Sequence, residues 1–388
     1  MKFDKVVYLR YMPLTRAIYN DFYFDDLIKN NIQVNYLDLT ALFFNINSED
    51  AVFDFENTIK IGSYKELKDY FRRQDKNRTL YISIMTFEGR VFKLFRLFSR
   101  FNLNLGVFAR GAFPHETVSK KSKIVRIIKK VTFEKVKGFI MNRLAFFCKK
   151  KGYIKSYDYI FKAGKYGYYG LGLGSEIDIK KAKIIEVNTV DYDEYLLHRG
   201  VVFESENNNI VFMDQYLPYH SDSTFFNIKS VEATRYYKEL NLFFDKLEAV
   251  TGKNVIIAAH PKAELYKEFN PFNSRSLFFN QSNDLVRDAW IVLTHASTAV
   301  GFPICYKKRV ILLESDHLNE RLPHFGVIMK SLVKTCGFTI LAMDKQEKFG
   351  VPEYLNFEQY DLFKYDYLTS LKSENQLSKD IFIEFIKE

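Results

Sequence analysis

The chain has 388 residues, of which 47% are hydrophobic and 17% aromatic, and its formal net charge is +10. This length and composition predict a folded protein with two hydrophobic cores and exclude an intrinsically disordered one. Three widely spaced cysteines, Cys148, Cys305 and Cys336, argue against a disulfide framework and a thiolate metal site. No apolar run is long enough to span a bilayer and the N-terminus lacks a signal-peptide pattern, so we expect a cytoplasmic protein.

The first half of the chain alternates strands and helices at the spacing of a parallel sheet. We expect a helix from Thr15 to Lys29, another around YKELKDYFRR, and strands at 5–10, 32–37, 79–85 and 103–109. The last of these strands is followed by Arg110, Pro114 and His115. Because the crevice beyond the carboxyl ends of parallel strands binds ligands, Arg110 and His115 are candidate acceptor-binding residues. A plain turn is the alternative, and it suits His115 better than Arg110.

Segment 117–151 carries the positive charge. Between Lys120 and Lys151 there are twelve Lys or Arg residues and one acid, Glu134, so this part alone has a net charge of +11. Its apolar residues recur at helical spacing, with a break near Gly138. These residues are Ile124, Ile127, Ile128, Val131, Val136, Phe139, Ile140, Leu144 and Phe147. The pattern predicts a basic amphipathic helix or helix pair.

Two interpretations of this segment stay open. An interfacial helix would lie on an anionic membrane surface, which would make the protein peripheral on the inner face of the cytoplasmic membrane. A helix packed on the core with a solvated basic face fits the pattern equally well. We do not expect nucleic acid as a partner, because no recognition motif accompanies the charge.

Two further strands follow, in YDYIFKAG and AKIIEVN. The glycine-rich stretch between them, 165–174, lacks the G-x-G-x-x-G spacing of a dinucleotide site, so we interpret it as a flexible surface loop. The acidic run after the second strand predicts a short connecting helix, with a wall of the acceptor site, including Asp193, as the alternative. Asp191-Tyr192-Asp193 has the letters of a metal motif, but we expect a helix start there and no metal.

The polar sequence ESENNN indicates a domain boundary, and the strand 210–213 opens the second domain. Asp214 ends this strand, and His220 and Asp222 follow in the next loop. General-base catalysis needs a carboxylate or an imidazole within reach of the acceptor hydroxyl, so Asp214, His220 and Asp222 are the candidate catalytic residues. Asp214 fits a loop cap equally well.

The stretch from Val255 to Ser315 is the most informative. One strand ends in His260-Pro261, the next in Thr294 before the hydroxyl turn Ala296-Ser297-Thr298, and a third in Glu314. A helix that opens at this turn would present free N–H groups to phosphate. Each feature alone fits an ordinary strand end or helix cap. Together they predict a nucleotide-phosphate site, whose candidate donor-binding residues are His260, Pro261, Lys262, Thr294, Ser297, Thr298 and Glu314.

These residues carry a resemblance, specific over Asn254 to Glu314 and architectural elsewhere. The chain resembles the GT-B glycosyltransferases of bacterial surface polysaccharides, and is most similar to the sialyl-, polysialyl- and Kdo transferases that use CMP-activated sugars. In those families the histidine of the His-Pro pair contacts CMP and the hydroxyl turn binds its phosphate. The matching positions here are His260-Pro261 and Ser297-Thr298, with Thr298 in place of the usual second serine.

The resemblance implies an α/β fold with two Rossmann-like domains facing a cleft. Residues 1–200 would bind a glycan or lipid-linked glycan acceptor, residues 207–345 the nucleotide sugar, and residues 346–388 would form a helical tail. It also implies a metal-independent transferase without a cofactor besides the donor, active in lipopolysaccharide or capsule synthesis. Two alternatives remain: a polyol-phosphate transferase with a CDP donor, and a non-catalytic nucleotide-sugar-binding subunit of an envelope assembly complex.

Overall fold

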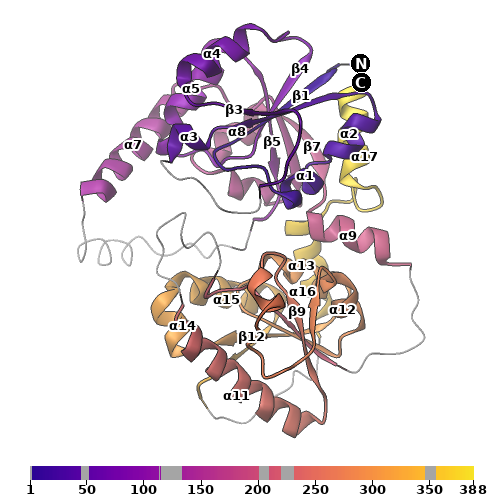
Figure 1. The fold of residues 1–388 in the computed structure, drawn as a ribbon. Coiled ribbons are helices and arrows are strands. Elements are labelled where there is room, and N and C mark those ends of the chain that lie inside the picture. The colour runs from indigo at the N-terminus through magenta and orange to yellow at the C-terminus, as the bar shows by residue number, and fades with distance from the viewer. Residues whose placement is uncertain are drawn as a thin grey trace. The chain divides into compact units, whose positions relative to one another are not determined.

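The computed structural model describes residues 2–44, 52–112, 114, 133–200, 209–219, 231–345 and 355–388. They form two compact units (Figure 1). The first comprises Met1–Ala112, Val118–Val190 and Asp366–Glu388, and the second Phe113–Thr117 and Asp191–Tyr365. Each contains a parallel sheet with helices packed around it, which confirms the predicted pair of Rossmann-like domains.

The described residues of the first unit contain a seven-stranded sheet of order β3-β2-β1-β4-β5-β6-β7, in which every neighbouring pair is parallel. Its strands are β1 (Lys5–Arg10), β2 (Gln33–Asp38), β3 (Thr58–Lys60), β4 (Thr79–Ser83), β5 (Asn104–Ala109), β6 (Tyr159–Ala163) and β7 (Lys183–Val187). The six strands expected here are confirmed. The short edge strand β3 was not predicted.

Both faces of this sheet are buried. In β1, Val6 and Tyr8 contribute to one apolar cluster and Val7 and Leu9 to another, because successive side chains of a strand point to opposite faces. The helices that cover the sheet are α1 (Arg16–Asp21), α2 (Phe24–Lys29), α3 (Thr40–Phe43), α4 (Tyr64–Arg72), α5 (Phe92–Phe101), α7 (Phe133–Lys150), α8 (Ser175–Lys181) and α17 (Ser378–Lys387), with the 3-10 turns η1 (Gly89–Val91) and η2 (Gly167–Leu171).

Two local predictions for this unit are wrong. The single helix expected from Thr15 to Lys29 is two helices, because Tyr23 adopts a left-handed conformation with a φ of 63° between α1 and α2. The expected break near Gly138 is absent, since α7 runs through it.

The glycine-rich stretch 165–174 is packed, not a flexible surface loop. A Cβ on Gly167 would lie 2.5 Å from the carbonyl oxygen of Ala109, and one on Gly172 would lie 2.5 Å from that of Phe87. Only glycine permits such close backbone approach. The stretch therefore forms the turn η2, with Leu171 buried in the core.

The described residues of the second unit contain a six-stranded parallel sheet of order β10-β9-β8-β11-β12-β13. Its strands are β8 (Ile210–Met213), β9 (Val255–Ala259), β10 (Leu277–Phe279), β11 (Ile291–Thr294), β12 (Arg309–Glu314) and β13 (Thr339–Ala342). Around it lie α9 (Val190–His198), α11 (Ala233–Thr251), η3 (Glu264–Lys267), α12 (Ser282–Asp288), η4 (Thr298–Val300), α13 (Gly301–Cys305), α14 (Asp316–Arg321), α15 (Pro323–Cys336) and α16 (Phe357–Phe363).

The division between the units differs from the expected 1–200, 207–345 and 346–388. The connecting helix expected after β7 is α9, and it belongs to the second unit, where the rings of Tyr195 and Tyr306 lie 5.1 Å apart. The tail is also divided. In α16 the Tyr360 hydroxyl donates to the carbonyl of Lys308 at 2.8 Å, but after the π-helical turn Lys364–Leu368 the chain returns to the first unit.

The last helix, α17, completes the first core. Phe382, Phe385 and Ile386 pack into the cluster that contains Tyr8 and Phe161. The two chain ends consequently lie side by side (Figure 1), and the backbone N–H of Lys2 donates to the carbonyl of Ile386 at 3.1 Å. The C-terminal residues are thus part of the first domain rather than an appended tail.

Candidate functional site

Polar residues stand at the carboxyl ends of four neighbouring strands in the second sheet. His260 follows β9, Asp214 follows β8, and Thr294 and Glu314 end β11 and β12. These strands are consecutive and parallel in the order β9-β8-β11-β12, so their carboxyl ends lie at one edge. We call this the carboxyl edge of the second sheet. The structure thereby confirms the placement predicted from the sequence, at the position where open α/β sheets bind ligands.

Asp214 is the most unusual residue at this edge. It is only 6% exposed, and neither carboxylate oxygen makes a well-aligned hydrogen bond to any described residue. Burial raises the pKa of Asp214 to about 6, although the nearby N–H of Tyr216, the hydroxyl of Tyr266 and the N–H of Gln215 favour the charged form. Burying a carboxylate is costly, and a pKa close to neutrality suits a general base.

His260 is half-buried at the start of the turn after β9. Its Nδ1 accepts a hydrogen bond from the backbone N–H of Lys262 at 3.1 Å. In the neutral imidazole this places the proton on Nε2. Pro261 and Lys262 are exposed beside it.

The hydroxyl turn after β11 is compact. The Ser297 hydroxyl accepts from the N–H of Ala299 at 3.1 Å and so caps η4, which leads directly into α13. The expected helix opening is confirmed, but its first turn is 3-10 and α13 has only five residues. The carboxylate of Asp191 packs against this helix, since a Cβ on Gly301 would lie 2.7 Å from its Oδ2.

Thr294 and Glu314 have structural partners. The buried Thr294 hydroxyl donates to the carbonyl of Met213 at 3.2 Å, which links β11 to β8. Glu314 accepts from the side-chain amide of Asn319 at 3.1 Å. Thr294 therefore reinforces the edge on which the other residues stand.

His295 was not singled out from the sequence, yet it is fully buried beneath the site. Its Nδ1 lies 2.6 Å from the carbonyl of Leu313, so that nitrogen carries the proton, and Nε2 accepts from the Tyr236 hydroxyl at 2.9 Å. Burial lowers the pKa of His295 to about 4. His295 is thus a neutral residue that joins β11, β12 and α11.

A cluster of tyrosines surrounds Asp214, and it too was missed. The hydroxyls of Tyr237 and Tyr266 lie 2.7 Å apart, and the Tyr266 ring packs edge-on against Tyr216 at 5.1 Å. Burial raises the pKa of both Tyr237 and Tyr266, so their phenols stay neutral hydrogen-bond donors. The repeated tyrosines near Asp214 in the sequence were the available signal, but only the fold brings Tyr266 to it.

His220, Asp222 and His115 lie outside the described residues. Asp193 lies in α9 and is half-buried.

Arg110 follows β5 in the first unit, at the predicted strand end. It donates to the Tyr23 hydroxyl at 2.6 Å and to the carbonyl of Asp21 at 2.8 Å, and it lies 4.5 Å from the centre of the Phe108 ring. These contacts hold the turn between α1 and α2. Acceptor binding by Arg110 stays a prediction.

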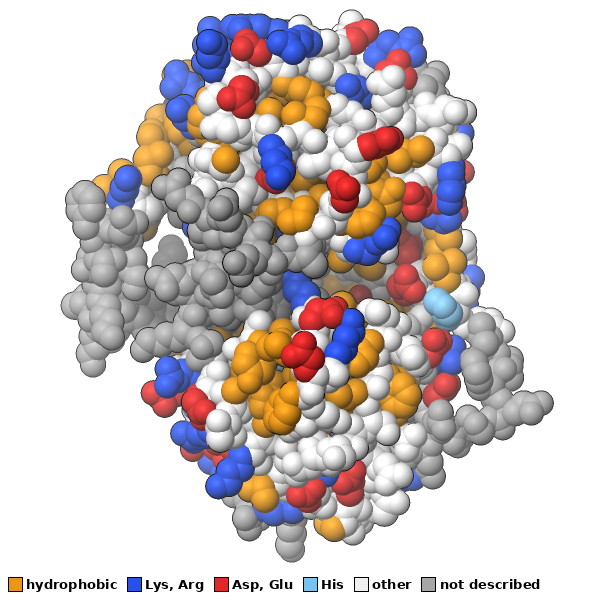
Figure 2. All heavy atoms as spheres, in the orientation of Figure 1, with side chains coloured by type: hydrophobic (Ala, Val, Ile, Leu, Met, Phe, Trp, Pro, Cys, Tyr) orange, Lys and Arg blue, Asp and Glu red, His pale blue; other side chains and the backbone are white. Residues whose placement is uncertain are grey.

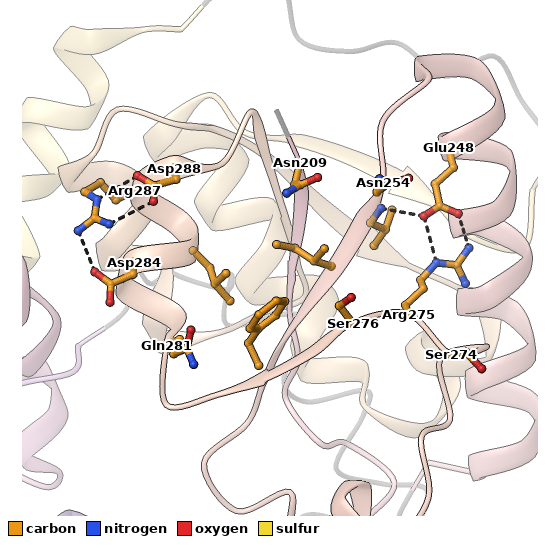
Figure 3. Close-up of a pocket in the computed structure, with 14 residues that line it drawn as sticks. Asn209, Glu248, Asn254, Ser274, Arg275, Ser276, Gln281, Asp284, Arg287 and Asp288 are labelled. Atoms are coloured by element: carbon orange, nitrogen blue, oxygen red, sulfur yellow. Dashed lines mark hydrogen bonds and ion pairs between the residues drawn. The ribbon is translucent and has the colours of Figure 1, made fainter. Parts of the chain in front are cut away.

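A pocket of about 770 Å³ lies elsewhere in the second unit (Figure 3). Asn209 and Asn254, which line it, precede β8 and β9, so it is at the opposite edge of the sheet from His260. Its arginines point at acidic neighbours: Arg275 pairs with Glu248 at 2.6 Å, and Arg287 pairs with both Asp284 and Asp288. Both arginines are already paired with carboxylates, so the carboxyl edge remains the better candidate site. Within the described ranges no cluster of three or more His, Cys, Asp or Glu side chains could hold a metal ion.

Neither a protein-family model nor a curated protein sequence matches the chain. Among the solved structures that are similar to it over nearly its whole length are a glycosyltransferase and a polymerase. CalG4, the calicheamicin glycosyltransferase, is 10% identical with a TM-score of 0.50 over 100% of this chain and 98% of that chain. A variant of the wall teichoic acid polymerase TagF is 12% identical with a TM-score of 0.53 over 99% of this chain and 89% of that chain. At such low identity the likeness concerns the fold alone, and it confirms the predicted GT-B type.

Proposed function

We propose that this chain is a glycosyltransferase of bacterial cell-surface polysaccharide synthesis that binds a nucleotide-activated donor at the carboxyl edge of the second sheet. The observation that carries the proposal is the convergence of Asp214, His260, Thr294 and Glu314 at the ends of four adjacent parallel strands. This is the position at which such sheets bind nucleotides. The structural similarity to CalG4 and TagF supports a transferase on this fold.

The donor we propose is a CMP-linked sugar of the sialic acid or Kdo type. The Nε2–H of His260 donates to the nucleotide, and the turn Ser297-Thr298 offers hydroxyl and backbone N–H donors to the phosphate. In the reaction an acceptor hydroxyl attacks the anomeric carbon, the bond from that carbon to the phosphate oxygen breaks, and CMP departs with the negative charge. Donors fixed in place before the reaction stabilise this charge as it develops.

The acceptor hydroxyl must lose its proton, and we propose that Asp214 receives it. A carboxylate with a pKa of about 6 is largely ionised at neutral pH and is more basic than an ordinary aspartate. Asp214 is almost covered, so this role needs the acceptor to enter beside the tyrosine cluster. The next candidates are His220, Asp222, His115 and Asp193, in that order.

A polyol-phosphate transferase with a CDP donor is the second candidate function. It is favoured by the similarity to TagF, including a TagF structure soaked with CDPG, which is 12% identical to this chain with a TM-score of 0.53. In that reaction the acceptor oxygen would attack phosphorus rather than carbon. A non-catalytic nucleotide-sugar-binding subunit of an envelope assembly complex would instead bind the donor without turnover.

One experiment distinguishes these functions. The purified chain is first screened by thermal shift against CMP, CDP, UDP and GDP, then incubated with matching donors and candidate acceptors. Transfer from a CMP-sugar adds a sugar without phosphate to the acceptor, whereas transfer from a CDP-polyol adds a phosphodiester. Both release CMP, so the mass of the acceptor product decides. Nucleotide binding without any product would favour the non-catalytic subunit.

A further inference from the structure

Helix α7 is fixed to the first unit by one of its sides. The side-chain oxygen of Asn142 accepts from the backbone N–H of Gly89 at 2.7 Å, and Ala145 is fully buried. Gly89 is required there, because a Cβ would lie 2.8 Å from backbone atoms of Met141 and Asn142. Among described residues, these contacts give α7 a defined inward side.

A buried ion pair secures the end of the helix. Lys149 and Asp178 of α8 are almost completely inaccessible to solvent and are paired, and the Lys149 ammonium also donates to the carbonyl of Leu173 at 3.1 Å. The same ammonium lies 4.3 Å from the centre of the Phe87 ring. Since breaking a buried pair is strongly destabilising, α7 is held against rotation about its axis.

The opposite side of α7 is apolar and exposed. Successive residues of an α-helix are about 100° apart around its axis, so six large hydrophobic side chains lie at least about 100° around the helix from Ala145. They are 39% to 59% exposed and comprise Val136, Phe139, Ile140, Leu144, Phe146 and Phe147. We call these six residues the outward face of α7. Figure 2 shows hydrophobic side chains beside basic ones at the left margin of the first unit, where α7 lies.

Over the described part of the basic segment, this exposure disagrees with the core-packed interpretation; Ile124, Ile127, Ile128 and Val131 of the stripe lie outside the described residues. In the core-packed interpretation the apolar stripe is buried and the basic face is solvated. In the structure five of the stripe residues, Val136, Phe139, Ile140, Leu144 and Phe147, are all exposed. Contiguous exposed apolar patches mark interaction surfaces.

From Val136 to Lys151 every charged residue is basic. Lys137, Arg143, Lys150 and Lys151 are exposed on α7 or directly after it. The Arg143 guanidinium lies 5.1 Å from the Phe139 ring, and the Lys151 ammonium 5.9 Å from the Phe147 ring. Cations and aromatic groups are therefore interleaved on one surface.

We propose that the outward face of α7 docks on an anionic lipid surface. Its hydrophobic side chains enter the boundary between headgroups and acyl chains, while Arg143, Lys150 and Lys151 contact lipid phosphates. This combination of an apolar face with basic residues characterises helices that lie in the membrane interface. A second copy of the chain fits less well, because two such faces would bring like charges together. The proposal does not depend on which donor the second unit binds.

The test is sedimentation of the full chain with lipid vesicles at low salt. We expect the protein to bind vesicles that contain phosphatidylglycerol and not vesicles of phosphatidylcholine alone, with release as salt is raised. The triple variant Phe139→Gln, Ile140→Gln, Phe147→Gln should partition at least about tenfold more weakly, because three apolar side chains no longer gain from insertion. The matched control replaces three exposed apolar residues elsewhere, Leu242, Val250 and Leu371, by Gln, and should bind like the parent.

A second triple variant, which removes three positive charges, measures the electrostatic contribution to vesicle binding. Arg143→Gln, Lys150→Gln, Lys151→Gln should lose most of the preference for anionic vesicles, since each basic residue near the surface adds about fivefold to binding. Should the apolar variant fail to fold, Phe139→Trp gives a second measurement: its fluorescence should shift to the blue on anionic vesicles. Absence of vesicle binding, equal binding to neutral vesicles, an unshifted Trp, or a dimer that the apolar variant abolishes would each overturn the proposal.

Discussion

The backbone N–H of Asp214 donates to the carbonyl of Ala258 at 3.0 Å, and this bond sets the Asp214 carboxyl group beside the turn that begins at His260. The pairing continues the parallel register of β8 and β9, in which Met213 lies opposite Ala258. The proposed base and the proposed nucleotide-binding histidine are thus held by one sheet. Their relative placement depends on backbone geometry and not on a flexible loop.

The first prediction concerns turnover. Asp214→Asn keeps the shape of the side chain but removes its basic oxygen, so turnover should fall by about 10²–10⁴ while donor affinity is retained. Initial rates and nucleotide titrations on the same preparation check this. Near-normal turnover would rule out Asp214 as the base and direct attention to His220 and then Asp222.

The same substitution should change stability. Burial raises the pKa of Asp214 to about 6 from its ordinary 3.8, so the folded chain holds this proton more tightly than the unfolded chain does. The stability gained from the tighter binding of the proton is complete below pH 3.8 and is lost as the pH rises through 6. Asp214→Asn, which stays neutral, should be more stable than the parent at pH 8 by up to about 3 kcal/mol. Urea unfolding at pH 4 and pH 8 measures this. An equal difference at both values would mean that the buried charge is not its cause.

The pH dependence of stability that comes from His295 should have the opposite sign to that from Asp214. Burial lowers the pKa of His295 to about 4 from 6.5, so its contribution to stability is complete above pH 6.5 and is lost as the pH falls toward 4. We expect His295→Gln to be less stable than the parent at pH 7, because the bond to Leu313 or Tyr236 is weakened, and to show a smaller loss between pH 6.5 and 4. Thermal unfolding across this range tests it. An unchanged slope would argue that His295 is not the titrating group.

The hydroxyl turn should contribute only partly to donor binding. In Ser297→Ala, Thr298→Ala the backbone N–H groups remain, so nucleotide affinity should fall by about three- to tenfold and not be abolished. Calorimetric titration with the best nucleotide gives the value. If the double variant keeps full affinity and activity, these hydroxyls only cap η4, as the Ser297 bond to Ala299 does in the structure.

Most strands were predictable because each is an apolar run followed by a turn residue. The strands that were missed, β3, β10 and β13, have three or four residues that are only partly buried, which is too short for a periodic signal. The break at Tyr23 was not predictable, because a left-handed tyrosine has no local sequence signature. The return of α17 to the first core also depends on contacts far apart in the chain.

The candidate site was also predictable only in part. Asp214, His260, Ser297 and Thr298 could be found because polar residues after parallel strands meet at one edge of a sheet. The supporting groups could not, because the role of His295 is set by Leu313 and Tyr236, and that of Tyr266 by its approach to Asp214. Burial, which decides the pKa of Asp214 and of His295, is likewise a property of the folded chain.

The central claim, that a nucleotide binds at the carboxyl edge of the second sheet beside His260, is tested most directly by nucleotide titration of the parent and of His260→Ala. We predict that a cytidine nucleotide stabilises the parent by about 2.7 kcal/mol at 100 times its Kd. Affinity should fall at least about tenfold in folded His260→Ala, since a buried ligand group loses its hydrogen-bond donor, and remain unchanged in the control His324→Ala on α15. Equal affinity of parent and His260→Ala, or no stabilisation by CMP, CDP, UDP or GDP, would contradict the account.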